Sequence, residues 1–185
     1  MNKRVELKKY NEEGHRVYDC PICATGDVVV KDNLFYGKCD NCEATLIDYL
    51  PLPHQEAFHE SNAQYRLNIG GFGSGKTTAA CAEIATHALD TPNGRSLITA
   101  PTLSLVKDAV IPELNKFIPP WHIEISRLNP SPYYKLNNGH EIIVYSAADQ
   151  QKLRSLNLKA FYIEEASGIN YSISYQLINL LSSKQ

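Results

Sequence analysis

The sequence lacks several features that would assign it to a broad class at once. It has no apolar run of about 18 residues, so no transmembrane helix is predicted. The charged segment that opens the chain has no apolar stretch of the kind found in signal peptides. Lysine and arginine number 18 against 20 aspartates and glutamates, so the chain as a whole is not basic enough to indicate nucleic-acid binding. We therefore expect a cytoplasmic protein that does not contact membranes.

The composition changes twice along the chain, which predicts three parts. With 185 residues, of which 43% are hydrophobic, there is material for one good core and a small additional module. Residues 1–16 are predicted to form a polar arm, residues 17–49 a small cysteine-bearing module, and residues 50–185 a larger domain. Low-complexity tracts and internal repeats are absent.

The small module holds four cysteines in two pairs. Cys20 pairs with Cys23 and Cys39 with Cys42, and 15 residues separate the pairs. This spacing is typical of a structural zinc site in which protein sulfurs fill all four tetrahedral positions. The intervening segment is predicted to form a hairpin that brings the two turns together. Redox-active or uncoordinated thiols are the alternative, and whether such a zinc ribbon contacts nucleic acid or braces a domain stays open.

A glycine-rich segment at residues 70–77 matches the full G-x4-G-K-[ST] pattern of a Walker A phosphate-binding loop. A strand is predicted before it at residues 66–69 and a helix after it at residues 77–89, which is the context that the pattern requires. Backbone N–H groups of such a loop face phosphate oxygens, its lysine reaches the β- and γ-phosphates, and its threonine binds Mg²⁺. The residues predicted to contact the nucleotide here are Gly70, Gly71, Phe72, Gly73, Ser74, Gly75, Lys76, Thr77 and Thr78. The alternative is a chance glycine-rich turn.

A second motif, which is acidic, follows about 90 residues after the glycine-rich loop. The apolar strand predicted at residues 160–163 ends in Glu164 and Glu165, which has the form of a Walker B segment. Such a strand delivers carboxylates to the carboxyl edge of a parallel sheet, beside the phosphates. Glu164 is predicted to hold Mg²⁺, and Glu165 to polarise the attacking water as general base. The alternative is a pair of exposed glutamates that begin a helix.

Two further polar residues are candidates for the same site. Arg154 precedes the acidic strand and would stabilise charge during phosphoryl transfer, although an exposed helix arginine is an equally good interpretation. Gln55 lies upstream of the loop, where its amide would bind adenine, or where it simply faces solvent. Its neighbours His54 and His59 are expected to be ordinary surface histidines, because four cysteines already complete a zinc tetrahedron.

The remaining pattern predicts an α/β fold with a largely parallel sheet. Strands are expected at residues 96–100 and 121–128, and a hairpin at 133–136 and 141–146 around Asn137, Asn138 and Gly139. Helices are expected at residues 55–64, 149–156 and 170–181. A helix starting at Thr102 or Ser104 should kink or break at Pro112.

The order of these features resembles the N-terminal ATPase of the phage terminase large subunit, the motor that packages viral DNA. Over about residues 50–170 the matching segments are LPHQEAF, GGFGSGKT, ITAPT, NNGHEIIVYSA and KLRSLNLKAFYIEEAS. The resemblance implies a P-loop NTPase sheet of the RecA-like (ASCE) type that couples Mg-ATP hydrolysis to translocation of double-stranded DNA. It also implies the portal and the small terminase subunit as partners, a ring of identical subunits, and the host cytoplasm as location.

The resemblance further implies individual roles. Gln55 would read adenine, Lys76 and Thr77 would hold ATP and Mg²⁺, Glu164 would bind the metal and Glu165 would be catalytic. Arg154 matches the region that carries an arginine finger in that family, acting within the chain or on a neighbouring subunit. The zinc ribbon is not a general feature of the family.

Two parts of the family pattern are not found in the sequence. The nuclease half is absent, and so is the strand that follows the Walker B helix and inserts between the Walker A and Walker B strands. We therefore expect a sheet that is incomplete at its C-terminal end, and hence a fragment or half of a split gene. The alternatives are a helicase-like DNA-dependent ATPase and a nucleotide-binding zinc module without turnover.

Overall fold

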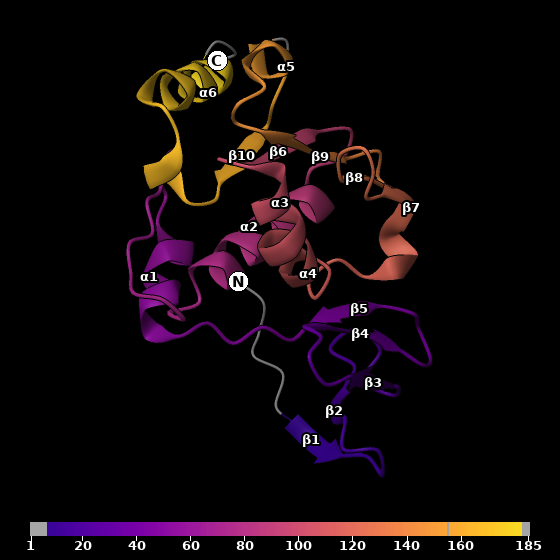
Figure 1. The fold of residues 1–185 in the computed structure, drawn as a ribbon. Helices are drawn as coiled ribbons and strands as arrows, with labels where there is room; N and C mark the ends of the chain where they lie inside the picture. Colours follow the sequence, from indigo (N-terminus) through magenta and orange to yellow (C-terminus); the bar gives the residue numbers. More distant parts are fainter. Residues whose placement is uncertain (1–6, 155, 183–185) are drawn as a thin grey trace. The chain divides into compact units, whose positions relative to one another are not determined.

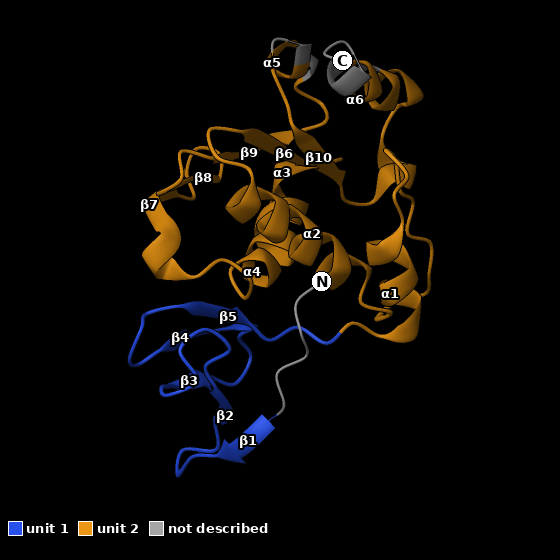
Figure 2. Ribbon diagram, turned by 180° about the vertical axis from the view of Figure 1, so that it is seen from behind, with its two compact units in different colours: residues 1–50 blue, residues 51–185 orange. Residues whose placement is uncertain are grey.

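The computed structural model describes residues 7–154 and 156–182 (Figure 1). The chain divides into two compact units, Met1–Leu50 and Pro51–Gln185, which are coloured separately in Figure 2. Within the described ranges, none of the helices has the length and apolar character needed to cross a bilayer.

The first unit is a five-stranded antiparallel sheet in the order β1-β2-β3-β4-β5. Its strands are β1 (Leu7–Tyr10), β2 (Arg16–Asp19), β3 (Asp27–Val30), β4 (Tyr36–Cys39) and β5 (Thr45–Ile47). Val28 and Val30 of β3 are fully buried. Part of the predicted polar arm therefore proves to be an edge strand: β1 is exposed throughout, and Lys8 pairs with Asp19 and Asp27 at 2.8 Å.

The second unit contains a mixed five-stranded sheet in the order β10-β6-β9-β8-β7. The strands are β6 (Arg95–Ala100), β7 (Ile123–Arg127), β8 (Tyr133–Leu136), β9 (Glu141–Ser146) and β10 (Ala160–Ile163). Strands β10, β6 and β9 are parallel, whereas β8 and β7 extend the sheet antiparallel. The expected parallel sheet is thus confirmed for three strands only. The predicted hairpin is confirmed, with Gly139 at φ +81° in its turn.

Helices cover both faces of this sheet, and Figure 1 shows them as separate layers. One face carries α5 (Gln150–Arg154) and α6 (Tyr171–Ser182), which form at the two predicted helical segments. Their contact with the sheet is a core of Leu97, Ile143, Ala147, Leu153, Leu158, Ile173 and Leu177. The other face carries α2 (Lys76–Asp90), whose buried side is rich in alanine, so the helix approaches the strands closely. A shorter helix, α1 (Pro53–Glu60), packs against α2.

The helix predicted after residue 102 forms in three pieces rather than one. Thr102 caps it by accepting from the Leu105 amide, and α3 (Leu103–Leu105) passes through a π-helical turn, η1 (Val106–Val110), into α4 (Ile111–Leu114). Pro112 cannot donate the backbone hydrogen bond that a regular helix needs at this point. The wide turn in front of it takes the place of the predicted kink. Two 3₁₀ turns follow further on, η2 (Pro120–His122) and η3 (Ala166–Gly168).

The strand predicted at residues 66–69 is wrong, because this segment has no regular structure. A short strand is stable only beside a partner that takes up its backbone hydrogen bonds. In the part of the chain that the structure describes, β10 is an edge strand with no neighbour beyond it. Leu67 and Ile69 are consequently 75% and 84% exposed.

Candidate functional site

The glycine-rich loop curls around the start of α2. Gly73 and Gly75 have positive φ values of 74° and 76°, a backbone conformation that glycine adopts without steric penalty. The ammonium group of Lys76 donates to the carbonyls of Gly70 and Gly71, both at 2.9 Å. The lysine therefore folds back over the loop, and the exposed ring of Phe72 lies at its tip.

Two side chains of helix α1 form hydrogen bonds with the backbone of the loop. The Gln55 side chain is only 3% exposed; its amide nitrogen donates to the Gly75 carbonyl at 2.9 Å and its oxygen accepts from the Leu52 amide at 2.7 Å. A Cβ at Gly75 would lie 2.5 Å from the Gln55 amide nitrogen, so the contact leaves no room for a side chain. His54 adds a 2.8 Å hydrogen bond to the Ser74 carbonyl. Both ends of the Gln55 amide are thus occupied by backbone.

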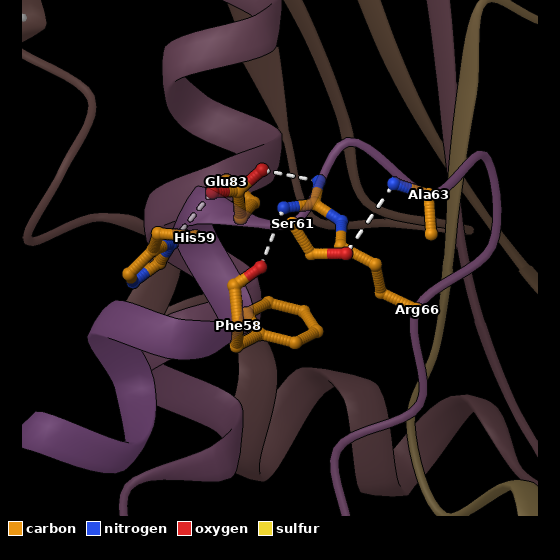
Figure 3. A network of polar contacts seen from close by, with 6 residues as sticks. All are labelled: Phe58, His59, Ser61, Ala63, Arg66 and Glu83. Carbon is orange, nitrogen blue, oxygen red and sulfur yellow. Dashed lines mark hydrogen bonds and ion pairs between the residues drawn. The ribbon is translucent and has the colours of Figure 1, made fainter.

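A charged network ties α1 and the following segment to α2 (Figure 3). Glu83 of α2 contacts His59 of α1 and Arg66, each at 2.5 Å. Arg66 also donates to the Phe58 carbonyl at 2.9 Å, and its guanidinium lies 4.9 Å from the centre of the Phe58 ring. Burial alone would raise the pKa of Glu83, but the hydrogen bonds from His59 and Arg66 outweigh it and lower the pKa. These contacts therefore hold α1 and the segment before the loop against α2.

The acidic end of β10 contacts the residue that follows the loop lysine. The Thr77 hydroxyl lies 3.2 Å from both carboxylate oxygens of Glu164, and the Glu164 amide donates to the Thr99 carbonyl at 2.9 Å. The contact joins the start of α2 to the end of β10. Burial raises the pKa of Glu164, while the hydrogen bond from Thr77 opposes this shift.

Around Glu164 the strand supplies a further polar group. The Tyr162 hydroxyl donates to Glu164 Oε2. The neighbouring Glu165 is exposed and has a left-handed backbone, φ 50° and ψ 56°, and its carboxylate accepts from the Ser167 hydroxyl at 2.5 Å. Hydroxyl and carboxylate oxygens are the ligands that Mg²⁺ prefers, so the donor set of Thr77 and Glu164 suits that ion.

Two other predicted contacts have different outcomes. Thr78 lies at the start of α2, but its hydroxyl donates to Glu113 of α4 at 2.7 Å, away from the loop. Glu113 also pairs with Lys116 at 2.5 Å. Arg154 is the last residue of α5, and its side chain lies outside the described part of the structure.

The four paired cysteines of the first unit converge. Their Sγ atoms all lie within 4.8 Å of one another, with 3.5 Å between Cys20 and Cys42 and 3.8 Å between Cys23 and Cys39. A tetrahedron with Zn–S bonds of about 2.3 Å has sulfurs about 3.8 Å apart. Backbone amides of Ile22 and Asn41 point at Sγ atoms at 3.4 Å. Hydrogen bonds from Thr25 lower the pKa of Cys23 to about 5, which favours the thiolate that metals require.

Sequence reasoning missed several polar residues that join the elements around the site. Glu83, Arg66 and Glu113 act through contacts between separate elements, which no local pattern indicates. Tyr162 is different, because it stands two positions before Glu164 on a strand, and such residues share a face. That spacing was a readable signal.

The second unit combines a mixed α/β sheet with a glycine-rich loop and an acidic strand end, and solved structures share this fold. The ATPase domain of the Thermus phage P74-26 large terminase is similar to this chain with a TM-score of 0.55 and 22% identity, over 72% of this chain and 61% of that one. The large terminase of a thermophilic bacteriophage is similar with a TM-score of 0.53 and 11% identity, over 62% of this chain and 30% of that one. At these identities the likeness establishes the fold alone.

The family follows from the sequence comparison. The model of the terminase large subunit, T4likevirus-type, N-terminal, matches residues 67–181, and the chain belongs to this family. No curated protein matches the chain. The chain spans 61% of the solved Thermus phage ATPase domain and less than a third of the other solved terminase.

Proposed function

We propose that this chain is the ATP-binding and ATP-hydrolysing motor domain of a viral DNA-packaging terminase. The observation that carries the proposal is the contact of Thr77 with Glu164, which joins the phosphate-binding loop to the acidic strand end. Family membership supports the packaging role. Double-stranded DNA is the proposed substrate of the motor, with a portal, a small terminase subunit and further copies of this chain as partners in the host cytoplasm.

Each residue of the proposed site has a separate task. The amides of the Walker A loop and the Lys76 ammonium bind the triphosphate, and Thr77 and Glu164 hold Mg²⁺. When bound, Mg²⁺ neutralises charge that develops on the phosphate oxygens. Glu165 accepts a proton from the water that attacks the γ-phosphorus, and Arg154 stabilises the departing charge. Gln55 stays a predicted adenine contact, but it must exchange its bond to Gly75 for one to the base.

Hydrolysis is tested by steady-state ATPase measurements on the 185-residue chain, with and without double-stranded DNA. We expect Glu165→Gln to reduce kcat at least about 100-fold while nucleotide binding is kept, and Lys76→Ala to abolish binding. Glu60→Gln, an exposed carboxylate at the end of α1, is the matched control. Equal rates for the parent and Glu165→Gln contradict the catalytic role, and nucleotide binding without turnover in the parent favours a binding module.

We also propose that Cys20, Cys23, Cys39 and Cys42 bind one structural Zn²⁺. The convergence of the four Sγ atoms supports this assignment. All four positions are protein ligands, so this ion braces the first unit and takes no part in hydrolysis. Both units would then contain one divalent metal each, with sulfur ligands in one and oxygen ligands in the other.

A further inference from the structure

The direction of side chains along β10 places Tyr162 beside the proposed metal site. Successive residues of a strand point to opposite faces of its sheet. Phe161 and Ile163 pack against the hydrophobic core beneath α5 and α6. Tyr162 and Glu164 therefore share the opposite face, which α2 covers, and this is the face from which Thr77 reaches Glu164.

The Glu164 carboxylate is held by two hydroxyl groups that approach from different elements. The Thr77 hydroxyl reaches it from the start of α2, and the Tyr162 hydroxyl donates to Oε2 from within β10. An ionised carboxylate only accepts hydrogen bonds, so both hydroxyls act as donors. Thr77 is itself a proposed metal ligand, and its oxygen must turn toward the ion. Among the residues that the structure describes, Tyr162 is then the side chain left to fix the orientation of the carboxylate.

We infer that Tyr162 is a positioning residue for Mg²⁺: its hydroxyl orients the Glu164 carboxylate toward the ion. The inference rests on the proposed function, because it assigns a partner to a ligand of that same site. Partners that hydrogen-bond a metal ligand from outside commonly contribute about 10–100-fold to metal affinity or activity. The phenol needs no direct contact with ion or nucleotide to have this effect.

The test is a titration of Mg²⁺ into the full chain saturated with a fluorescent ADP analogue, alongside analogue binding in EDTA. We expect Tyr162→Phe to weaken the apparent Mg²⁺ affinity about 10-fold and to leave metal-free binding unchanged. Tyr134→Phe is the matched control, because it removes the hydroxyl of a tyrosine on another strand, β8, which donates to Asn115 at 2.7 Å. Unchanged Mg²⁺ affinity, or an equal loss with and without Mg²⁺, overturns the inference.

A second arm separates positioning from general damage. In a Glu164→Gln background, Tyr162→Phe should add no further loss, because the two residues act through one carboxylate. Additive losses overturn the inference. If Tyr162→Phe fails to fold, the parent chain still decides: Mg²⁺ should perturb the tyrosine absorption spectrum of the ADP complex, and Glu164→Gln should abolish that change, whereas no change in the parent contradicts the inference. A parent chain that binds the analogue with no dependence on Mg²⁺ contradicts the proposed function instead.

Discussion

The Thr77 hydroxyl lies 3.2 Å from both carboxylate oxygens of Glu164, a residue 87 positions further along the chain. The parallel pairing of β10 with β6 brings this about, since it delivers the end of β10 to the side of the sheet where α2 begins. Without a cation, the contact places a half-buried carboxylate close to Glu165, and burial is the larger cause of the raised pKa of Glu164. The free protein therefore holds a carboxylate whose charged form its surroundings disfavour, and a nearby cation would favour that form.

Glu164→Gln is accordingly expected to stabilise the free chain while it weakens metal-dependent binding. Removing a carboxylate whose charged form the fold disfavours should raise Tm by roughly 1–3 °C, about the shift that half to one kcal/mol produces in a domain of this size. Thermal unfolding in EDTA measures this, with Glu60→Gln as the control. A lower Tm for Glu164→Gln would show that the carboxylate holds the site together even without metal.

The close approach of Gly75 to Gln55 predicts a strong position dependence for alanine in the loop. Gly75→Ala forces a side chain into a left-handed backbone and against the Gln55 amide, and should cost about 1–3 kcal/mol in unfolding free energy. Gly71→Ala meets no atom within 4 Å and should change it by less than about 0.5 kcal/mol. Urea unfolding of both variants decides, and similar losses would contradict the contact.

The Glu83 network predicts that α1 is held by charge. Glu83→Gln removes the ion pair with Arg66 and a carboxylate oxygen that His59 contacts, and should cost about 1–3 kcal/mol, with faster proteolytic cleavage in residues 61–66. Glu124→Gln is the matched control, because its ion pair with Lys135 is more exposed and should contribute only about 0–1 kcal/mol. Equal effects of the two substitutions would mean that α1 docks without help from Glu83.

A pair of histidines, His140 buried and His87 half-buried, predicts a loss of stability in mild acid. The rings of His87 and His140 meet edge to face with centroids 5.8 Å apart, and burial lowers the pKa of both. The unfolded chain then binds protons more readily than the folded one. Unfolding free energy should be highest above about pH 6.5, the ordinary histidine pKa, and should fall as the pH drops below it.

His87→Phe tests this dependence, because it keeps an aromatic ring in place and removes one titrating group. The decrease in urea-unfolding free energy between pH 7 and pH 5 should be smaller in the variant than in the parent. The Ser96 hydroxyl, 2.9 Å from His140, and the Thr91 carbonyl at 2.7 Å should keep the second ring in place. An equal decrease in both proteins would assign the acid sensitivity elsewhere.

The cysteine cluster predicts one zinc per chain. Cys20→Ser should abolish tight binding, because three sulfurs remain where four are needed, and the first unit should lose its ordered structure. Cys81→Ser should retain the metal, since Cys81 is buried in α2 and bonds the Val110 carbonyl at 3.8 Å. Elemental analysis of the purified variants measures both, and zinc retained by Cys20→Ser would exclude a four-sulfur site.

The elements with strong local signals were predictable. Strand β10 has the predicted bounds, α2 follows its loop as expected, and the Asn137-Asn138-Gly139 turn indicated the hairpin. These depend on periodicity and turn chemistry that neighbouring residues determine. The segment at residues 66–69 predicts a strand as clearly as the confirmed segments do, but a strand requires a partner strand. Its sequence carries no information on whether that partner is present.

The site divides in the same way. The meeting of Thr77 and Glu164 followed from a general rule on where parallel strands end. The hydrogen bond from the Gln55 amide to the Gly75 carbonyl could not be predicted in this way. The two residues are 20 positions apart, and the angle of α1 decides whether they meet. Long-range ionic contacts such as Arg66 with Glu83 depend on tertiary packing in the same way.

The open edge of β10 affects how readily the purified protein will aggregate. Its backbone has no neighbouring strand among the described residues, and the exposed side chains of Leu67 and Ile69 belong to the same unit. Such edges pair with strands of other molecules, so concentrated samples should become turbid and form β-rich aggregates on storage. Lysine substitutions at Leu67 and Ile69 should extend shelf life. Preparing the protein dilute and cold is therefore a practical condition for every assay described above.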